Sequence, residues 1–211
     1  MGFISITKRS SLVCLMMLAV FRSTTLAAPS KATVQPRIAL YVFNYARVPA
    51  NTLNSAEKEA TRIFHHAGIG IDWVNVNLEA NDSPRCAMNF KEQPCCMLRI
   101  HPRLTNDTFP HLVAGYALHG TPYATIIFDA IVQEANSVAR SQSLILGHTM
   151  AHEIAHLFLP QGYHSLAGIM QAHIDESSWR QADQGSLLFS SGEIKWLQQN
   201  VLAHRQDDNV R

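Results

Sequence analysis

The residues of this 211-residue chain best suited to chemistry form one short motif, His152-Glu153-Ile154-Ala155-His156. Two histidines four residues apart on a helix lie about 40° from each other around the axis, so both imidazoles project from one face. Such a pair can hold one zinc ion, and the carboxylate between them can take a proton from water beside the metal. The motif therefore predicts metal-assisted hydrolysis with two ligands and a general base.

The segment around the motif predicts a buried helix. Residues 144–159 form a long apolar run without proline, and Pro160 and Gly162 follow it as stop signals. A core helix with hydrogen-bonded histidines would also fit this run. It explains Glu153 poorly, however, because a buried glutamate is costly unless it has a partner. We therefore interpret the run as a helix that presents His152, Glu153 and His156 to a metal site.

A catalytic zinc needs a third protein ligand, and residues beyond the helix can supply it. His164 is the nearest and is the ligand we expect. Glu176 is the main alternative, although it could equally lie at a helix start or in an exposed turn. His173 is a further candidate. His148 shares the helix face but lies about 12 Å along the axis from His156, so we expect it to bond a backbone carbonyl or to support the site.

The run from His152 to Met170 resembles the metzincin clan of zinc peptidases. Their pattern is His-Glu-x-x-His-x-x-Gly-x-x-His, followed by a tight turn that carries a methionine, the Met-turn. The matching positions are His152, Glu153, His156, His164, Ser165 and Met170. The metzincin glycine falls at Leu159, and the third histidine lies two residues beyond its expected position. The chain is thus similar to an outlying metzincin-like family of small secreted bacterial proteins.

The resemblance implies an α+β fold. Its parts are a twisted mixed sheet with a backing helix, a zinc-binding helix, a Met-turn and a C-terminal helix. It also implies that Met170 supports the metal site from below without taking part in the chemistry. The strand around Ala114, Gly115 and Tyr116 would be the edge strand beside the cleft, where an extended substrate borrows main-chain hydrogen bonds.

The pattern of apolar residues predicts the elements that position the motif. Alternation predicts strands over residues 36–45 and 69–77, with further strands over 97–101, 112–118 and 121–129. A helix capped by Asn51 or Asn54 is expected to run to His66. Residues 130–140 are expected to be helical or irregular. Ser190 and Glu193 form a capping box that opens a final helix through about residue 204.

The N-terminus predicts the compartment. Lys8 and Arg9 precede an apolar stretch over residues 12–21, and small residues follow at Ala27 and Ala28. This is the pattern of a secretory signal peptide over residues 1–28, and the apolar part is too short to span a membrane. We expect a secreted or periplasmic protein with one catalytic domain over residues 29–211 and no stable membrane anchor after cleavage.

Composition narrows the partners. The chain has 17 basic and 16 acidic residues, with no basic patch that would indicate nucleic-acid binding. In an oxidising compartment we expect one disulfide, from Cys86 to either Cys95 or Cys96, which leaves one free thiol. The mature protein is expected to be a monomer.

The sequence therefore predicts a secreted zinc endopeptidase with one Zn²⁺ per chain and a polypeptide substrate. In the expected mechanism, His152, His156 and His164 hold the zinc, and Glu153 takes a proton from the attacking water and passes it to the leaving amine. Two other functions stay open. One is a zinc-bearing pseudo-protease that only binds peptides. The other is a different zinc hydrolase, such as an amidase that acts on cell-wall peptides.

Overall fold

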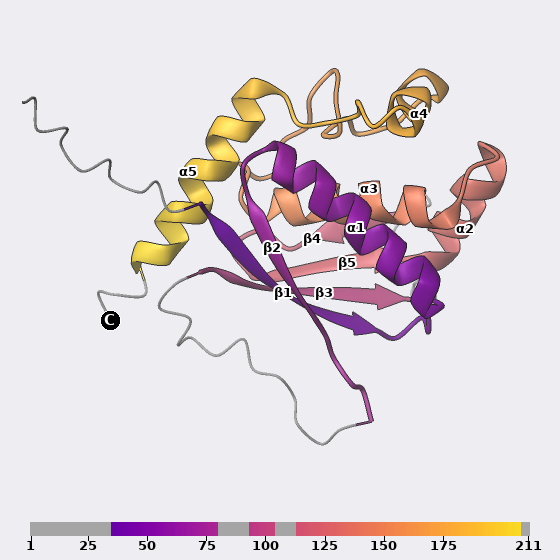
Figure 1. Ribbon diagram of the computed structural model, residues 1–211, viewed down its shortest axis with the longest axis horizontal. Helices are drawn as coiled ribbons and strands as arrows, with labels where there is room; N and C mark the ends of the chain where they lie inside the picture. Colours follow the sequence, from indigo (N-terminus) through magenta and orange to yellow (C-terminus); the bar gives the residue numbers. More distant parts are fainter. Residues whose placement is uncertain (1–34, 80–92, 104–112, 208–211) are drawn as a thin grey trace, which may run out of the picture. The chain divides into compact units, whose positions relative to one another are not determined.

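A five-stranded sheet forms the base of the molecule, as the computed structural model shows (Figure 1). The structure describes residues 35–79, 93–103 and 113–207, all within the unit Val34–Arg211. The strands are β1 (Arg37–Asn44), β2 (Gly70–Asn75), β3 (Cys95–His101), β4 (Gly115–Ala117) and β5 (Tyr123–Ile127). Their order is β2-β1-β3-β5-β4, and every neighbouring pair is parallel except β4 and β5. The predicted mixed sheet is confirmed, and β4 lies at its edge.

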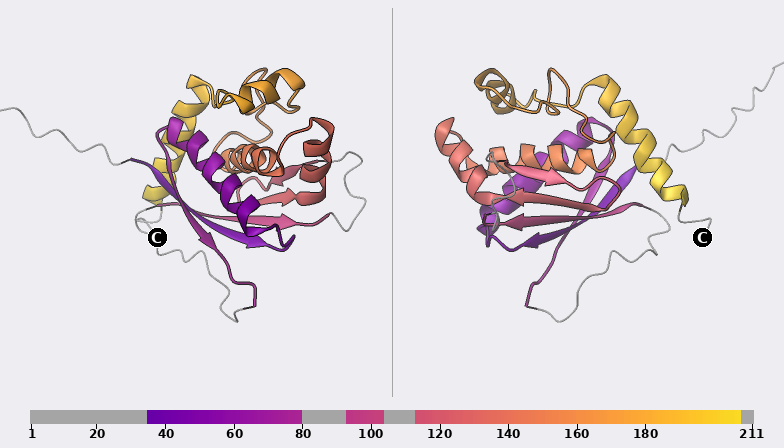
Figure 2. Two further views of the ribbon diagram at one scale, coloured as in Figure 1. Left: turned by 45° about the vertical axis from the view of Figure 1, so that its right-hand side comes forward. Right: turned by 180° about the vertical axis from the view of Figure 1, so that it is seen from behind.

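Five helices accompany the sheet in the described part of the chain. They are α1 (Ala50–His66), α2 (Phe128–Ser137), α3 (Gln142–His156), α4 (Glu176–Asp183) and α5 (Ser191–Asp207). Helices α1 and α3 pack against each other on one face of the sheet (Figure 2). None of the described helices is long and apolar enough to cross a membrane.

The main core lies between the sheet and these two helices. Alternate residues of a strand point to opposite faces, so one set of β1 and β3 side chains meets the helices. Ile38, Leu40, Leu98 and Ile100 are fully buried there. Helix α1 covers them with residues that include Phe64, and α3 adds buried residues that include Leu146 and Met150. The burial of these apolar side chains fixes α3 against the sheet and sets the direction of its histidines.

The predicted helix starts have different outcomes. The capping box of α5 is confirmed: the Ser190 N–H donates to Glu193 Oε2 at 2.7 Å, and the Glu193 N–H donates to Ser190 Oγ at 3.3 Å. The predicted cap of α1 is wrong, because the helix begins at Ala50 with Pro49 in the cap position and no side-chain cap. The turn before α1 is instead closed by Asn44, whose side-chain amide exchanges two hydrogen bonds with the backbone of Val48.

The cysteines follow the strand alternation of β3. Cys95 is disulfide-bonded, whereas Cys96 is a buried free thiol whose pKa is raised to about 12 by burial. Of the two pairings expected from the sequence, the one through Cys96 is therefore wrong, because Cys96 faces the core under the helices. The expected partner of Cys95 is Cys86, which lies outside the described residues. The predicted signal peptide also lies outside them.

Candidate metal centre

Three imidazoles converge where α3 ends. One nitrogen atom from each of His152, His156 and His164 lies within 4.8 Å of the others. The Nε2 atoms of His152 and His156 are 2.9 Å apart, and the ring centroid of His164 lies 5.4 Å and 4.9 Å from those of His152 and His156. Ser141 caps α3 through a hydrogen bond from the Leu144 N–H at 3.2 Å, so the helix that carries two of these histidines has a fixed start.

The protonation of the His152 and His156 rings suits a metal ion. The Nδ1–H of His152 donates to the Ile169 carbonyl at 2.8 Å, which leaves the lone pair of Nε2 directed at His156. Burial lowers the pKa of His152, and burial together with the other two rings lowers the pKa of His156 to about 3. Neutral imidazoles with converging lone pairs are the form that binds a divalent cation. Three nitrogen donors at these separations fit a zinc ion with one open position.

The loop after α3 brings the third histidine back to the helix. The Ser165 N–H donates to the Met170 carbonyl at 2.9 Å, and the Ile169 N–H donates to the Leu188 carbonyl at 3.1 Å. Gly168 has a φ of 82°, and a Cβ there would lie 2.8 Å from the Leu188 oxygen. This tight turn needs glycine. Met170 is fully buried next to Ile169, the residue whose carbonyl orients His152.

A second contact holds the same loop to α5. The Tyr163 hydroxyl donates to Glu193 Oε1 at 3.3 Å, and its ring lies edge-on to Trp196. Glu193 is fully buried and also closes the capping box. The residue before His164 is therefore tied to the start of the last helix. The capping box can be recognised in the sequence, but its contact with the loop that carries His164 cannot.

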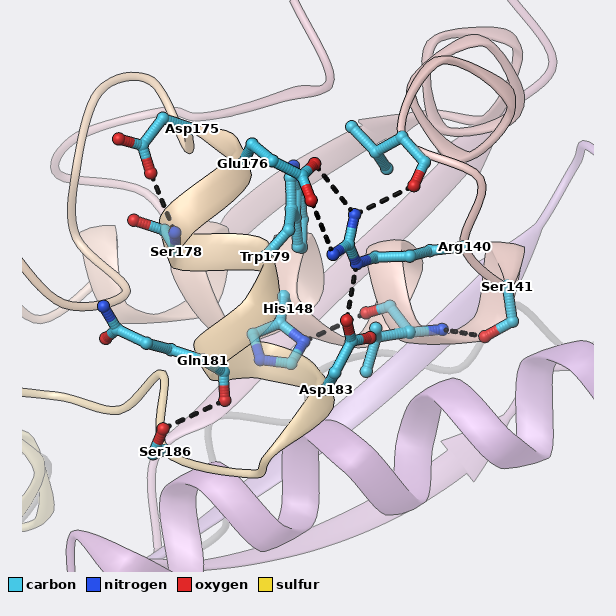
Figure 3. Close-up of polar contacts among 12 residues, drawn as sticks. Arg140, Ser141, His148, Asp175, Glu176, Ser178, Trp179, Gln181, Asp183 and Ser186 are labelled. Carbon is cyan, nitrogen blue, oxygen red and sulfur yellow. Dashed lines mark hydrogen bonds and ion pairs between the residues drawn. The ribbon is translucent and has the colours of Figure 1, made fainter.

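The other candidate ligands lie elsewhere. Glu176 is at the start of α4, where its two carboxylate oxygens accept hydrogen bonds from Arg140 at 3.1 Å (Figure 3). Asp175 caps this helix by accepting a hydrogen bond from the Ser178 N–H at 2.8 Å, so Glu176 lies at a helix start, which was one of the two positions weighed for it. His148 is fully buried and bonds the Leu144 carbonyl through Nδ1 at 3.0 Å. His173 lines the cavity beside the three clustered histidines, called the triad below, but is not one of them.

Glu153 lies in the same cavity and packs against the edge strand. Only 6% of the residue is exposed, and burial raises the pKa of its carboxyl group to about 8. A carboxyl group that titrates near neutral pH can both accept and release a proton during a reaction. A Cβ added to Gly115 would lie 2.7 Å from Cγ of Glu153, so the strand backbone and this side chain are in direct contact.

The edge strand also presents backbone groups to the cavity. Hydrogen bonds join the Ile127 N–H to the Ala114 carbonyl and the Leu118 N–H to the Tyr123 carbonyl. In this antiparallel register, residues 114, 116 and 118 face β5, so the N–H and C=O groups of Gly115 and Ala117 point away from it. The cavity between β4 and the histidines has a volume of about 820 Å³. An extended peptide could therefore add to β4 within reach of the triad.

The contact between Gly115 and Glu153 leads to a mutational prediction. Gly115→Ala is expected to lower kcat for peptide hydrolysis by about tenfold to 100-fold, because the new methyl group would lie 2.7 Å from Cγ of Glu153 and 2.8 Å from the Thr125 carbonyl oxygen and so displaces the Glu153 carboxylate. Zinc content should not change, since the triad is untouched. Steady-state kinetics and metal analysis check both outcomes. Gly192→Ala, where the added methyl group has open space around it, is the matched control. An unchanged kcat in Gly115→Ala would contradict this reading of the contact.

Three histidines of α3 should contribute less to the stability of the metal-free protein as the pH falls. Burial lowers the pKa values of His148, His152 and His156 below the 6.5 of an ordinary histidine. Each of these histidines then binds a proton more readily in the unfolded chain, so its contribution to stability is complete above about pH 6.5 and declines as the pH falls through its folded pKa. Burial raises the pKa values of Glu57 and Glu153, and these two carboxyl groups act in the opposite direction. Denaturant unfolding at a series of pH values measures this slope. On acidification, His148→Gln should lose less stability, or gain more, than the unmodified protein, whereas the exposed His66→Gln should match it. An equal pH dependence in His148→Gln and the unmodified protein would contradict the prediction.

Comparison with known proteins gives a likeness in structure only. No protein-family model matches the chain, and no curated protein sequence does. A zinc-dependent peptidase from Methanocorpusculum labreanum (strain Z) has a TM-score of 0.51 at 16% sequence identity, covering 76% of this chain and 99% of its own. Archaemetzincin from Methanopyrus kandleri has a TM-score of 0.49 at 14% identity, with 82% and 99% covered. Archaemetzincin from Archaeoglobus fulgidus, complexed with malonate, has a TM-score of 0.42 at 14% identity, with 76% and 99% covered. The first likeness shows that the chain has the fold of a zinc-dependent peptidase.

Proposed function

We propose that this protein is a secreted zinc endopeptidase of metzincin-like type. One observation carries the proposal: three imidazoles and one buried carboxyl group face a single cavity whose opposite wall is the edge strand β4. His152, His156 and His164 would hold one zinc ion per chain, and a polypeptide would be the substrate. The fold shared with a zinc-dependent peptidase supports this assignment.

The chain's own residues account for the remaining steps. Zinc, when bound, supplies Lewis acidity that lowers the pKa of water and polarises a carbonyl group. The backbone groups of Gly115 and Ala117 hold the substrate extended along β4. Glu153 accepts the proton of the attacking water and then donates it to the leaving amine nitrogen. The Ile169 carbonyl keeps His152 in the tautomer whose Nε2 can bind the metal. Met170, which is fully buried, would support the site without taking part in proton transfer.

The proposed location follows from the signal-peptide pattern of residues 1–28 and is supported by the disulfide at Cys95. Sequencing the N-terminus of the exported protein tests it. The expected mature chain begins near residue 29, is a monomer and has no membrane anchor. A protein that keeps residues 1–28 and stays in the cytoplasm would contradict this part of the proposal.

Mass spectrometry of an unfolded polypeptide incubated with the purified protein tests the activity. We expect new internal termini, no cleavage after a chelator has removed the metal, and recovered cleavage once zinc is restored. Cell-wall peptide fragments, assayed in parallel, distinguish a peptidase from an amidase of the wall. Peptide binding without cleavage in the zinc-loaded protein would point to a pseudo-protease and contradict the proposal.

A further inference from the structure

We propose that the cavity selects a substrate with a lysine or arginine side chain, and that Glu134 is the counter-ion for this cation. The inference rests on the proposed peptidase function and adds a substrate class to it. The same cavity is lined by the three histidines and, away from them, by residues of α2 and α4. A peptide held at the triad could therefore direct one side chain toward Glu134.

The walls of this part of the cavity are largely apolar. They include Ala130, Ile145, Ile174 and the ring of Trp179. Thr149 also lines the cavity, but its hydroxyl is occupied because it donates to the Ile145 carbonyl at 2.9 Å. Such walls suit the aliphatic stem of a long side chain, because burying this apolar surface away from water lowers the free energy of the complex. The polar side chains of Gln133, Ser137 and Gln171 also line the cavity, but none of them carries a charge that could pair with a cation.

Glu134 gives this apolar region a negative charge. Apart from Glu153 at the triad, it is the only carboxylate among the described residues that line the cavity, and no lysine or arginine is among them. Oε1 accepts a hydrogen bond from Trp179 Nε1 at 2.8 Å, and Oε2 accepts only a long one from Ser137 Oγ at 3.5 Å. In the described part of the chain Glu134 has no ion pair, so its charge is available to a ligand.

Arg140, which follows α2 in the chain, has its guanidinium engaged with α4. It donates to Glu176 at 3.1 Å and to Asp183 at 2.8 Å (Figure 3). These ion pairs hold the helix that carries Trp179, and His148 supports Trp179 edge-on with ring centroids 6.0 Å apart. The hydrogen bond from Trp179 therefore fixes the Glu134 carboxylate in a preorganised wall. A site of this kind should bind a cation more tightly when the cation is carried on an apolar stem.

Matched peptides test the proposal. Three peptides differ at one position beside the cleaved bond, which carries lysine, norleucine or glutamate, and the substitution is repeated on each side of that bond. At one position we expect kcat/KM for lysine to exceed that for norleucine, which keeps the stem without the charge, by about tenfold. In Glu134→Gln this ratio should fall toward one. The glutamine Oε1 can still accept the Trp179 hydrogen bond, so the variant removes the charge and keeps the wall.

Asp129→Asn is the matched control, because Asp129 is an exposed carboxylate of the same helix outside the cavity lining. It should leave the lysine preference unchanged. Calorimetric binding of the same peptides to zinc-loaded Glu153→Gln gives a second readout that needs no cleavage, and the lysine peptide should again bind about tenfold more tightly. Equal affinity for lysine and norleucine, or a preference that survives Glu134→Gln, would overturn the proposal. Absence of hydrolysis with an intact binding preference would instead count against the peptidase function alone.

Discussion

Glu153→Gln is expected to keep one zinc per chain and to lose peptide hydrolysis by about 10³-fold or more in kcat. The amide has the size of the carboxyl group, so the packing against Gly115 is preserved. It cannot accept the proton of the attacking water, and the step that depends on Glu153 fails. Zinc content by atomic absorption, together with steady-state kinetics, separates loss of the base from loss of the metal.

Glu57→Gln is a suitable control for that experiment. Glu57 is also a buried carboxyl group whose pKa is raised by burial, but it lies on α1 and does not line the cavity. Its replacement should leave kcat unchanged. Full activity in Glu153→Gln would refute the general-base assignment, whereas equal losses in both variants would indicate a general effect of replacing a buried acid.

The second large effect is expected from the third ligand. His164→Ala should weaken zinc binding by at least about 100-fold, since the loss of a residue that merely orients a ligand already costs 10- to 100-fold. Competition with a chromophoric chelator measures the dissociation constant. The structure clusters His164 with His152 and His156. Glu176, which lies on α4, instead accepts a hydrogen bond from Arg140.

Two variants make this prediction specific. His173→Ala removes a histidine that lines the same cavity outside the triad, and Glu176→Gln removes the alternative ligand weighed from the sequence. Both should bind zinc with the affinity of the unmodified protein. If Glu176→Gln lost zinc and His164→Ala did not, the ligand set would be His152, His156 and Glu176, and the present geometry would be wrong.

The parts of the site predicted best from the sequence are those set by local geometry. The helix and its spacing brought His152 and His156 to one face, and the capping box located the start of α5. His164 was harder to predict, because an irregular loop with a positive-φ glycine returns it to the helix. The spacing of apolar residues does not reveal that the loop turns back toward α3. Hydrogen bonds to distant segments, such as that from the Ile169 N–H to Leu188, fix the turn that follows it.

Features that depend on long-range contacts could not be predicted. Helix α4 has only two buried apolar residues, and ion pairs from Arg140 hold it to the rest of the molecule. The contact of Gly115 with Glu153 joins an edge strand to a helix almost forty positions away in the chain. The alternation of side chains along a strand could have predicted that Cys95, and not Cys96, forms the disulfide. The prediction missed it because the expected strand began at residue 97, after both cysteines, whereas β3 begins at Cys95.

The most direct test of the central claim, that three histidines hold a zinc ion on which peptide hydrolysis depends, is a zinc titration of the metal-free protein followed by the rate of peptide cleavage. The account predicts no cleavage at the start, a linear rise to one equivalent of zinc per chain, and no further rise beyond it. Cleavage that is already complete without zinc, or a zinc-saturated protein that still cleaves no peptide bond, would contradict it.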